Sequence, residues 1–292
     1  MQSFGYGSYI TASLTLYMQY DLHTHSTVSD GTMTPTELVQ HAGKNGVDVL
    51  ALTDHDSTGG INEAMDAARA TGISLIGGVE ISVKWERMTV HILGLDIDPG
   101  GATLQEGLAR LRVSRQWRAE EIGRKLDKAG FQNAYEGAKK YASGQLIGRA
   151  HFARYIVECG KASTVSDVFR KYLVKNKPGH VTGQWATLED AVGWITDAGG
   201  YAVIAHPGRY KMSATKFRRF IEQFRENGGV GIEVVSGSHS PSDRHNMAQY
   251  AKRYGLYASQ GSDYHGPENP WIEIGRLQDL PEGCKPVWAL WS

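Results

Sequence analysis

The sequence predicts an α/β barrel with an inserted helical cap, and three features of the chain lead to this prediction. Short apolar or β-branched runs alternate with helix-like segments over most of the 292 residues, as expected for parallel strands joined by helical crossovers. Between residues 101 and 186 this alternation gives way to consecutive helices. Histidine and carboxylate side chains follow successive strands, as in barrels whose strand-to-helix loops converge on one face.

Seven segments are predicted as strands because each is a short apolar or β-branched run that ends in polar residues. They are residues 20–25, 47–53, 74–82, 89–95, 202–206, 231–235 and 256–261. Helices are predicted between them at residues 34–44, 59–70, 215–226 and 242–254. The first helix begins at Thr34-Pro35-Thr36-Glu37, which combines capping side chains with an early proline.

Residues 101–186 are predicted to form a basic helical insertion, which we call the cap. Four helices are expected there, at residues 103–129, 133–141, 148–158 and 165–174, and no run is long enough to join the sheet. The cap has 16 Lys and Arg residues against 7 Asp and Glu, whereas the rest of the chain has 15 against 24. Such a local excess of positive charge usually indicates an anionic partner, with a solvated helical surface as the alternative.

Because 41% of the residues are hydrophobic, the chain can bury a substantial core, and its composition is equally consistent with one large α/β domain with an insertion and with two domains. We favour the single domain. The barrel is expected to comprise residues 18–100 and 187–292, after an N-terminal extension of residues 1–17 that lacks a signal-peptide pattern. Cys159 and Cys284 are too few for a disulfide framework, which indicates a reducing compartment and predicts a cytoplasmic protein. No apolar run reaches the roughly 18 residues of a transmembrane helix, so no membrane partner is expected.

Eight side chains of metal-binding chemistry lie in or just after the predicted strands. They are His23 and His25 of the first strand, His55 after the second, Glu80 in the third, His91 in the fourth, His206 of the fifth, and Asp263 and His265 after the seventh. Alternate residues of a strand share a face, so the spacing of His23 and His25 directs both imidazoles to one side. Imidazole and carboxylate together suit zinc, manganese or iron, and such ligands from several strands would form a polynuclear site that activates water.

Six motifs around these residues resemble the PHP (polymerase and histidinol phosphatase) family of metal-dependent phosphoesterases. They are His23-Thr24-His25-Ser26, Thr53-Asp54-His55-Asp56, Gly78-Val79-Glu80, Val90-His91-Ile92, Ala205-His206-Pro207-Gly208 and Gly261-Ser262-Asp263-Tyr264-His265. The cap motif Gly148-Arg149-Ala150-His151-Phe152-Ala153-Arg154 is similar to the bacterial TrpH/RNase AM branch of that family. The resemblance extends from about residue 19 to the C-terminus and implies a distorted seven-stranded β/α barrel.

The resemblance also implies a set of metal ligands and two or three manganese ions, with zinc, iron and magnesium as alternatives. The implied ligands are His23, His25, Glu80 and Asp263 for one ion, the bridging Glu80 with His91 and His206 for a second, and Asp30, His55 and His265 for a third. Asp30 stands where some family members have histidine. Asp30 and His55 are therefore also candidates for catalytic contact with the substrate.

Members of this branch are 5′-to-3′ exoribonucleases that also dephosphorylate 3′,5′-bisphosphate nucleotides. The implied partners are RNA 5′ ends and such nucleotides, without an obligate protein partner. Guanidinium groups bind phosphate through paired hydrogen bonds. The candidate substrate-binding residues are Arg115, Arg118, Arg149, His151, Arg154 and Arg209, with ordinary surface roles as the alternative for Arg115 and Arg118.

Three other functional classes share part of this pattern. A small-molecule phosphatase acting on histidinol phosphate would need the same metals but no basic cap. A non-catalytic PHP module would have lost ligands, whereas the set here is complete. An amidohydrolase shares the barrel and the metals, but no carbamylated-lysine or mononuclear pattern is evident. Because no phosphate-binding Gly-rich loop or activated serine is evident either, water is the predicted nucleophile.

Overall fold

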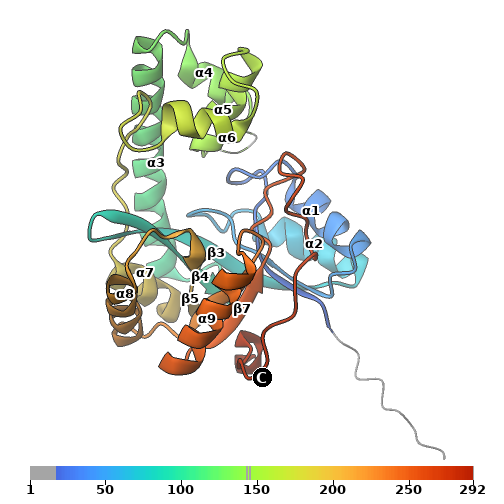
Figure 1. Ribbon diagram of the computed structural model, residues 1–292. Coiled ribbons are helices and arrows are strands. Elements are labelled where there is room, and N and C mark those ends of the chain that lie inside the picture. The colour runs from blue at the N-terminus through green and yellow to red at the C-terminus, as the bar shows by residue number, and fades with distance from the viewer. Residues whose placement is uncertain (1–17, 143, 145, 292) are drawn as a thin grey trace, which may run out of the picture.

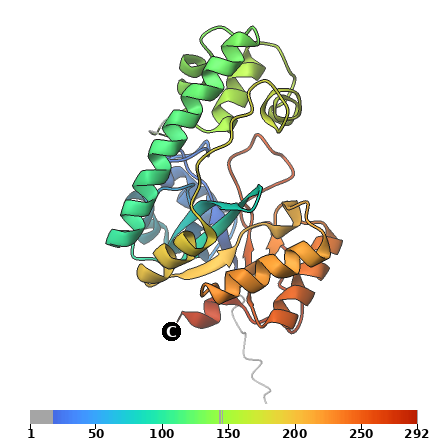
Figure 2. The same ribbon diagram turned by 90° about the vertical axis from the view of Figure 1, so that its left-hand side faces the viewer.

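The computed structural model describes residues 18–142, 144 and 146–291, so the predicted N-terminal extension lies outside the described residues. Seven strands form one sheet in sequence order, which curls into a nearly closed barrel (Figures 1 and 2) and confirms the predicted fold class. They are β1 (Tyr20–Thr24), β2 (Val49–Leu52), β3 (Ser74–Trp85), β4 (Met88–Leu95), β5 (Tyr201–Ile204), β6 (Gly231–Ser236) and β7 (Tyr257–Gly261). The chain after β7 returns to β1, where the Asp263 N–H donates to the His23 carbonyl at 2.8 Å.

The direction of β4 differs from the prediction of parallel strands throughout. β4 runs antiparallel to β3 and β5, while the other neighbouring pairs are parallel. Only Glu86 and Arg87 separate β3 from β4, too few residues for a helical crossover, and Glu86 adopts a left-handed conformation (φ 50°) that suits a tight hairpin. In this hairpin His91 lies opposite Ser82, in the C-terminal half of β3. The reversed strand therefore still brings His91 to the edge where the parallel strands end.

Five helices pack around the barrel: α1 (Pro35–Lys44), α2 (Ile61–Thr71), α7 (Leu188–Asp197), α8 (Ala214–Glu226) and α9 (Pro241–Tyr254). All but α7 were predicted, with small differences at their ends. A capping box begins α7, because the Asp190 N–H donates to Thr187 Oγ1 at 3.0 Å and the Thr187 N–H donates to Asp190 Oδ2 at 3.3 Å. The signal was present in the sequence, with aspartate in place of the usual glutamate or glutamine.

The cap contains α3 (Ala102–Lys128), α4 (Ala134–Lys139), α5 (Arg149–Glu158) and α6 (Val165–Val168), followed by a π-helical turn, η1 (Phe169–Leu173). Helix α3 belongs to two hydrophobic clusters. Leu104 and Leu108 near its start pack in the main barrel core, whereas Ile122 and Leu126 near its end pack with Phe152 in a separate cluster. The helix thus rises from the barrel and holds the shorter helices above it (Figures 1 and 2). Among the described residues, no helix combines the length and apolar character needed to cross a bilayer.

Candidate metal centre and adjoining cavities

Four ligand-type side chains meet at the edge of the barrel where the parallel strands end, and all four are buried. They are His23 from β1, His25 just after β1, Glu80 from β3 and Asp263 just after β7. The Nε2 atoms of the two histidines lie 3.1 Å apart. Glu80 Oε2 lies 3.4 Å from the first of these nitrogens and 3.3 Å from the second. Asp263 Oδ1 lies 3.4 and 3.2 Å from the same two atoms.

These four atoms have the spacing of ligands around one metal ion. Ligand bonds of about 2.0–2.2 Å place neighbouring ligand atoms about 2.8–3.6 Å apart in octahedral and tetrahedral sites. The distances here, from 3.1 to 3.4 Å, fall within that range. Glu80 Oε2 is buried without a hydrogen-bond partner, and burying a carboxylate oxygen is costly unless a cation or a donor faces it. The residues therefore fit a divalent cation.

Glu80 also faces a second group of candidate ligands. Its Oε2 lies 2.8 Å from His55 Nδ1, while its Oε1 lies 2.7 Å from His91 Nδ1 and 2.9 Å from His206 Nε2. Because its two oxygens face different histidines, Glu80 has the position that a carboxylate bridging two ions requires. His55, Glu80 and His91 form a compact set of three. His206 contacts Glu80 without joining a compact set among the described residues.

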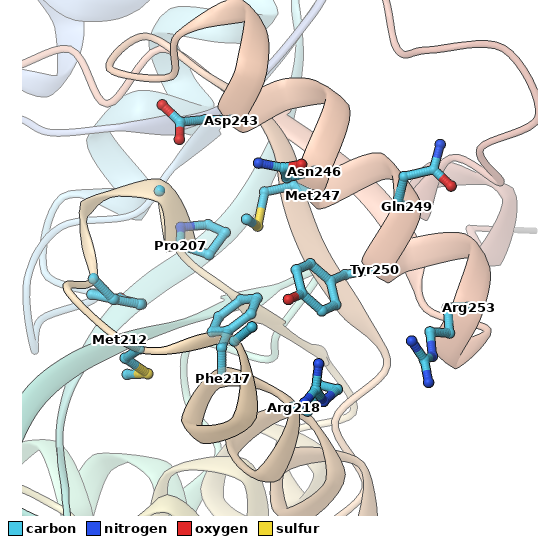
Figure 3. A pocket seen from close by; sticks show the side chains of 13 residues that line it. Pro207, Met212, Phe217, Arg218, Asp243, Asn246, Met247, Gln249, Tyr250 and Arg253 are labelled. Carbon is cyan, nitrogen blue, oxygen red and sulfur yellow. The ribbon is translucent and has the colours of Figure 1, made fainter.

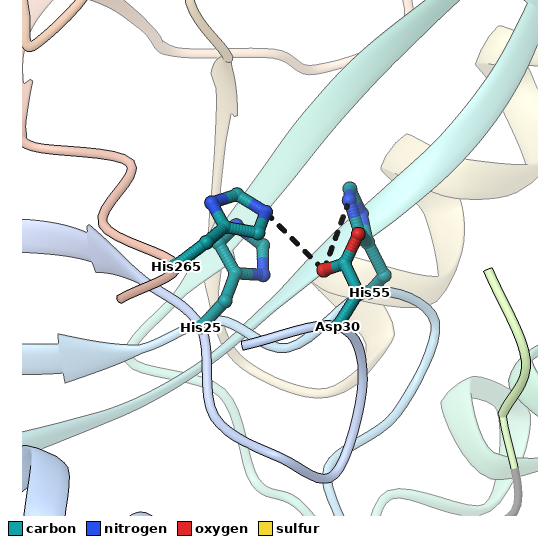
Figure 4. Close-up of side chains that lie close together, drawn as sticks. All are labelled: His25, Asp30, His55 and His265. Atoms are coloured by element: carbon teal, nitrogen blue, oxygen red, sulfur yellow. Dashed lines mark ion pairs between the residues drawn. The ribbon is translucent and has the colours of Figure 1, made fainter. Parts of the chain in front are cut away.

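A third group lies closer to solvent and joins His25, Asp30, His55 and His265 (Figure 4). We call these three sets of candidate ligands the metal groups. Asp30 Oδ1 lies 3.2 Å from His265 Nε2 and 3.9 Å from His55 Nε2. The side chains of Asp30 and His265 are 18% and 31% exposed, whereas Glu80 is fully buried. His25 was expected only in the first group, and the structure brings it to this group as well.

Burial and charge compete at these side chains. Burial favours the neutral acid of Glu80, but the facing imidazoles, above all that of His55, hold its pKa well below the usual range. Burial also opposes ionisation of Asp263, but the Arg209 guanidinium and nearby imidazoles hold its pKa well below the usual range. Burial lowers the pKa of His206 to about 4. At neutral pH both carboxylates are thus ionised and His206 is neutral, the forms in which these groups bind metals.

Glu233 of β6 supports the first group and was not identified from the sequence. Its Oε1 lies 2.9 Å from His23 Nδ1, and its Oε2 accepts the backbone N–H of His206. Glu233 is fully buried, and its contact with Nδ1 leaves Nε2 of His23 directed toward Glu80 and Asp263. The available signal was an acidic residue directly between the apolar residues Ile232 and Val234 of this strand.

Replacing Glu233 with glutamine should weaken metal binding by about 10- to 100-fold, because a neutral amide orients the His23 imidazole less firmly and makes it less basic. Competition with a chromogenic chelator would measure the affinity. Glu226→Gln, an exposed change on α8, is the matched control and should leave the affinity unchanged. Equal affinities in the Glu233→Gln and wild-type proteins would contradict the positioning role.

A cavity of about 470 Å³ opens between the barrel and the cap, beside the second and third groups. Asp30, His55 and His91 line its barrel side. We call it the arginine cavity, after its basic lining residues Arg87, Arg115, Arg118, Arg149, Lys175 and His180. Three of the six were candidate substrate contacts in the sequence. Arg87, Lys175 and His180 were missed because nothing in their local pattern distinguishes them from surface residues.

Positive charge is crowded in the arginine cavity. Burial, together with Arg149 and Arg115, lowers the pKa of Arg118 to about 9. Burial and Arg115 also lower the pKa of Arg149. Arg115 is held by Asp56 Oδ2 at 2.5 Å and by Ser82 Oγ at 2.9 Å. Guanidinium groups held close together in this way favour the binding of an anion between them.

His151, a predicted phosphate contact, lies outside the arginine cavity lining. Its side chain is buried, and its Nδ1 accepts the Gly148 N–H at 3.0 Å where α5 begins. Burial lowers the pKa of His151 to about 4, so the imidazole is neutral at physiological pH. The geometry therefore gives His151 a role in the start of α5.

Two further candidate substrate contacts, Arg154 and Arg209, form ion pairs with carboxylates. Arg154 Nε donates to Glu268 at 2.9 Å, which ties the cap to the loop after β7. Arg209 Nη1 lies 2.6 Å from Asp263 Oδ2, beside the first metal group. Both charges are thus largely satisfied within the protein, as is that of Arg115, whereas Arg118 and Arg149 form no ion pair among the described residues.

A separate groove of about 510 Å³ lies between α8 and α9 (Figure 3). Phe217 and Arg218 of α8 line one side, and Met247 and Tyr250 of α9 line the other. None of the residues that line this groove belongs to the three metal groups. We therefore assign it no part in the reaction.

Comparisons with known proteins agree on one family. The PHP domain model matches residues 21–237. A 3′,5′-nucleoside bisphosphate phosphatase from Chromobacterium violaceum is 51% identical over 92% of this chain and 94% of its own length. The 5′-3′ exoribonuclease Rnm of Escherichia coli is 47% identical over 94% of each chain.

Solved structures show the same fold. An amidohydrolase from Chromobacterium violaceum, solved with bound sulfate and no metal, is 50% identical with a TM-score of 0.90, over 93% of this chain and 95% of its own. A protein proposed to be a metal-dependent phosphoesterase, from Bifidobacterium adolescentis, is 27% identical with a TM-score of 0.80, over 94% of each chain.

Proposed function

Because the chain belongs to the PHP domain family and is a metal-dependent phosphoesterase, we propose that it is a 5′-to-3′ exoribonuclease that also removes the 3′-phosphate of 3′,5′-bisphosphate nucleotides. Relatives named for these two activities are 51% and 47% identical to it. The structural observation that supports the proposal is the arginine cavity, which adjoins the candidate metal ligands Asp30, His55 and His91.

One substrate position accounts for both reactions. A terminal 5′-phosphate in the arginine cavity would place the phosphorus attached to O3′ of the same nucleotide near the metal groups. Attack by water on that phosphorus breaks its bond to O3′ and releases a 5′-mononucleotide in both cases. From a bisphosphate nucleotide the second product is inorganic phosphate. From RNA it is a chain shortened by one nucleotide, which again carries a 5′-phosphate.

The protein's side chains bind and orient the substrate in this scheme. Arg118 and Arg149 hold the 5′-phosphate, because both line the arginine cavity and neither is in an ion pair among the described residues, whereas Arg115 is paired with Asp56. Asp30 and His55 line the cavity where it meets the metal groups, and in this scheme they contact the reacting phosphate or hold a third ion. Bound metals would supply an activated water and neutralise charge on the phosphoryl oxygens.

Manganese is our proposal for the metal, with two or three ions per chain. Three groups of ligands support that number, and their mixture of imidazole and carboxylate is compatible with Mn²⁺. Resemblance to the exoribonuclease branch favours manganese over zinc, iron or magnesium. RNA 5′ ends and bisphosphate nucleotides are the proposed partners, and the free thiols Cys159 and Cys284 support a cytoplasmic location.

Replacing Arg149 with alanine should lower kcat/KM on 5′-phosphorylated RNA by roughly tenfold to a hundredfold, because a charge-assisted contact with the 5′-phosphate contributes about 1.5–3 kcal/mol. Hydrolysis of an aryl phosphate should change much less, since that substrate has no second phosphate to anchor. Steady-state rates on the two substrates measure the difference within one protein.

Arg110→Ala is the matched control, because Arg110 also lies on a cap helix but is largely exposed and does not line the arginine cavity. It removes the same charge and should leave both rates unchanged. Equal losses on both substrates in Arg149→Ala, or a wild-type enzyme indifferent to the 5′-phosphate, would defeat the anchoring model and leave a general phosphoesterase.

A further inference from the structure

A second cavity, of about 940 Å³, opens on the other side of the metal groups. Three of its lining residues, Asp30, Asp263 and His265, are candidate metal ligands, and Asp30 also lines the arginine cavity. Its outer wall is the loop after β7, residues 266–272, which rises from the barrel toward the cap (Figures 1 and 2). The two cavities therefore meet at the metal groups.

Trp271 lies in this loop, lines the second cavity and is 88% exposed. An indole normally contributes to stability by burying its large apolar surface, so an indole left in solvent beside a reaction centre is available to a ligand. The loop beneath it is held in place. Glu268 pairs with Arg154 of the cap at 2.9 Å, and the Ile272 N–H donates to the Asn269 carbonyl at 3.1 Å.

The two cavities differ in their free charge. In the second cavity both arginines are paired, Arg154 with Glu268 and Arg209 with Asp263. In the arginine cavity Arg115 is paired with Asp56, but Arg118 and Arg149 form no ion pair among the described residues. The second cavity is thus less suited to a terminal phosphate and better suited to a flat, uncharged group such as a base.

We propose that Trp271 stacks on a base of the RNA chain that follows the scissile phosphate. The inference rests on the proposed function: with the 5′-phosphate in the arginine cavity and the scissile phosphate at the metal groups, the remaining nucleotides leave through the second cavity, past the indole. Stacking on an aromatic side chain accepts any base and therefore suits a sequence-tolerant exonuclease. A bisphosphate nucleotide has no nucleotide beyond the scissile phosphate and does not reach Trp271.

The test compares adenosine 3′,5′-bisphosphate with a 5′-phosphorylated adenosine pentanucleotide. Trp271→Ala should lower kcat/KM on the pentanucleotide by about five- to hundredfold, the range for loss of one base–aromatic contact, and leave the bisphosphate rate about unchanged. Trp271→Phe should retain most of the pentanucleotide rate. Trp117→Ala is the matched control, because Trp117 is 45% exposed on α3 and lines neither cavity. It should leave both rates unchanged.

Two further measurements separate stacking from other effects. Anisotropy titration of the metal-loaded protein with a 3′-labelled pentanucleotide whose first phosphodiester is replaced by a non-hydrolysable methylphosphonate should show the same loss of affinity in Trp271→Ala. Removing single bases beyond the first nucleotide should slow the wild type at one position and not slow Trp271→Ala further there, because the two changes delete the same contact.

The outcomes are distinct. Equal losses on the bisphosphate and the pentanucleotide would assign Trp271 to the first nucleotide and overturn the inference. Unchanged rates on both would overturn it as well. A wild-type enzyme that hydrolyses the bisphosphate but not the pentanucleotide would refute the exoribonuclease proposal itself, whatever the variants do.

Discussion

Replacing Glu80 with glutamine is expected to lower kcat on every phosphate ester by at least about 10²–10³-fold, the cost of removing one preorganised electrostatic contact. The expected loss is large because Glu80 faces two of the three ligand groups. Its Oε2 lies near His25 and His55, and its Oε1 lies 2.7 Å from His91. Glutamine keeps the volume of the side chain but removes the charge that holds cations at both positions. Rates and elemental analysis of the purified variant would measure the effect.

Glu86→Gln is the matched control for this experiment. Glu86 lies on the hairpin between β3 and β4, where it pairs with Lys216 and Arg219 at the surface and away from the metal groups. The control should keep its metal and its activity. Full activity in Glu80→Gln would rule out the bridging role. A loss of activity with normal metal content would show that Glu80 acts on the reaction and is not needed to hold the ions.

Removal of metals by chelation is expected to abolish activity and to lower the stability of the fold. Ions that bind only the native state stabilise it by about 2.7 kcal/mol at a concentration 100 times Kd. They are expected to do so here because Glu80 and Asp263 are buried carboxylates beside His23 and His25. Thermal unfolding and activity should recover together on addition of Mn²⁺.

Recovery with each metal in turn would identify the ion. The highest activity with Zn²⁺, Fe²⁺ or Mg²⁺ would contradict the assignment of manganese while leaving the ligand set intact. Unchanged activity after complete chelation, checked by elemental analysis, would contradict metal dependence at this site.

The candidate ligands were predictable because strand periodicity and barrel topology act together. Alternate residues of an extended chain share one face, which directs His23 in β1 and His25 just after it to one side, and parallel strands end at a common edge. His91 was also predicted as a ligand, but the direction of its strand was predicted wrongly. Its position depends on the reversal of β4 in a two-residue hairpin, whereas the alternation of strands and helices had predicted a parallel strand.

Contacts between distant segments were not predictable from local spacing. Glu233 lies 210 residues from His23, whose ring it orients, and Arg154 pairs with Glu268 across 114 residues. His151 belongs to a recognisable motif, yet its imidazole is buried at the start of α5. The exposure of Trp271 was not predictable either, because a sequence does not show which apolar side chains are buried in a core.

The sequence by itself determined the barrel class of this protein, its candidate histidine and carboxylate ligands and the basic charge of its cap. These follow from residue type and short-range periodicity, which the chain carries at every position. The tertiary structure alone decided which arginines remain free for a substrate, which carboxylate orients His23 and where the two cavities meet. Those features depend on burial and on contacts between segments far apart in the chain, and both arise only when the barrel closes and α3 holds the cap above it.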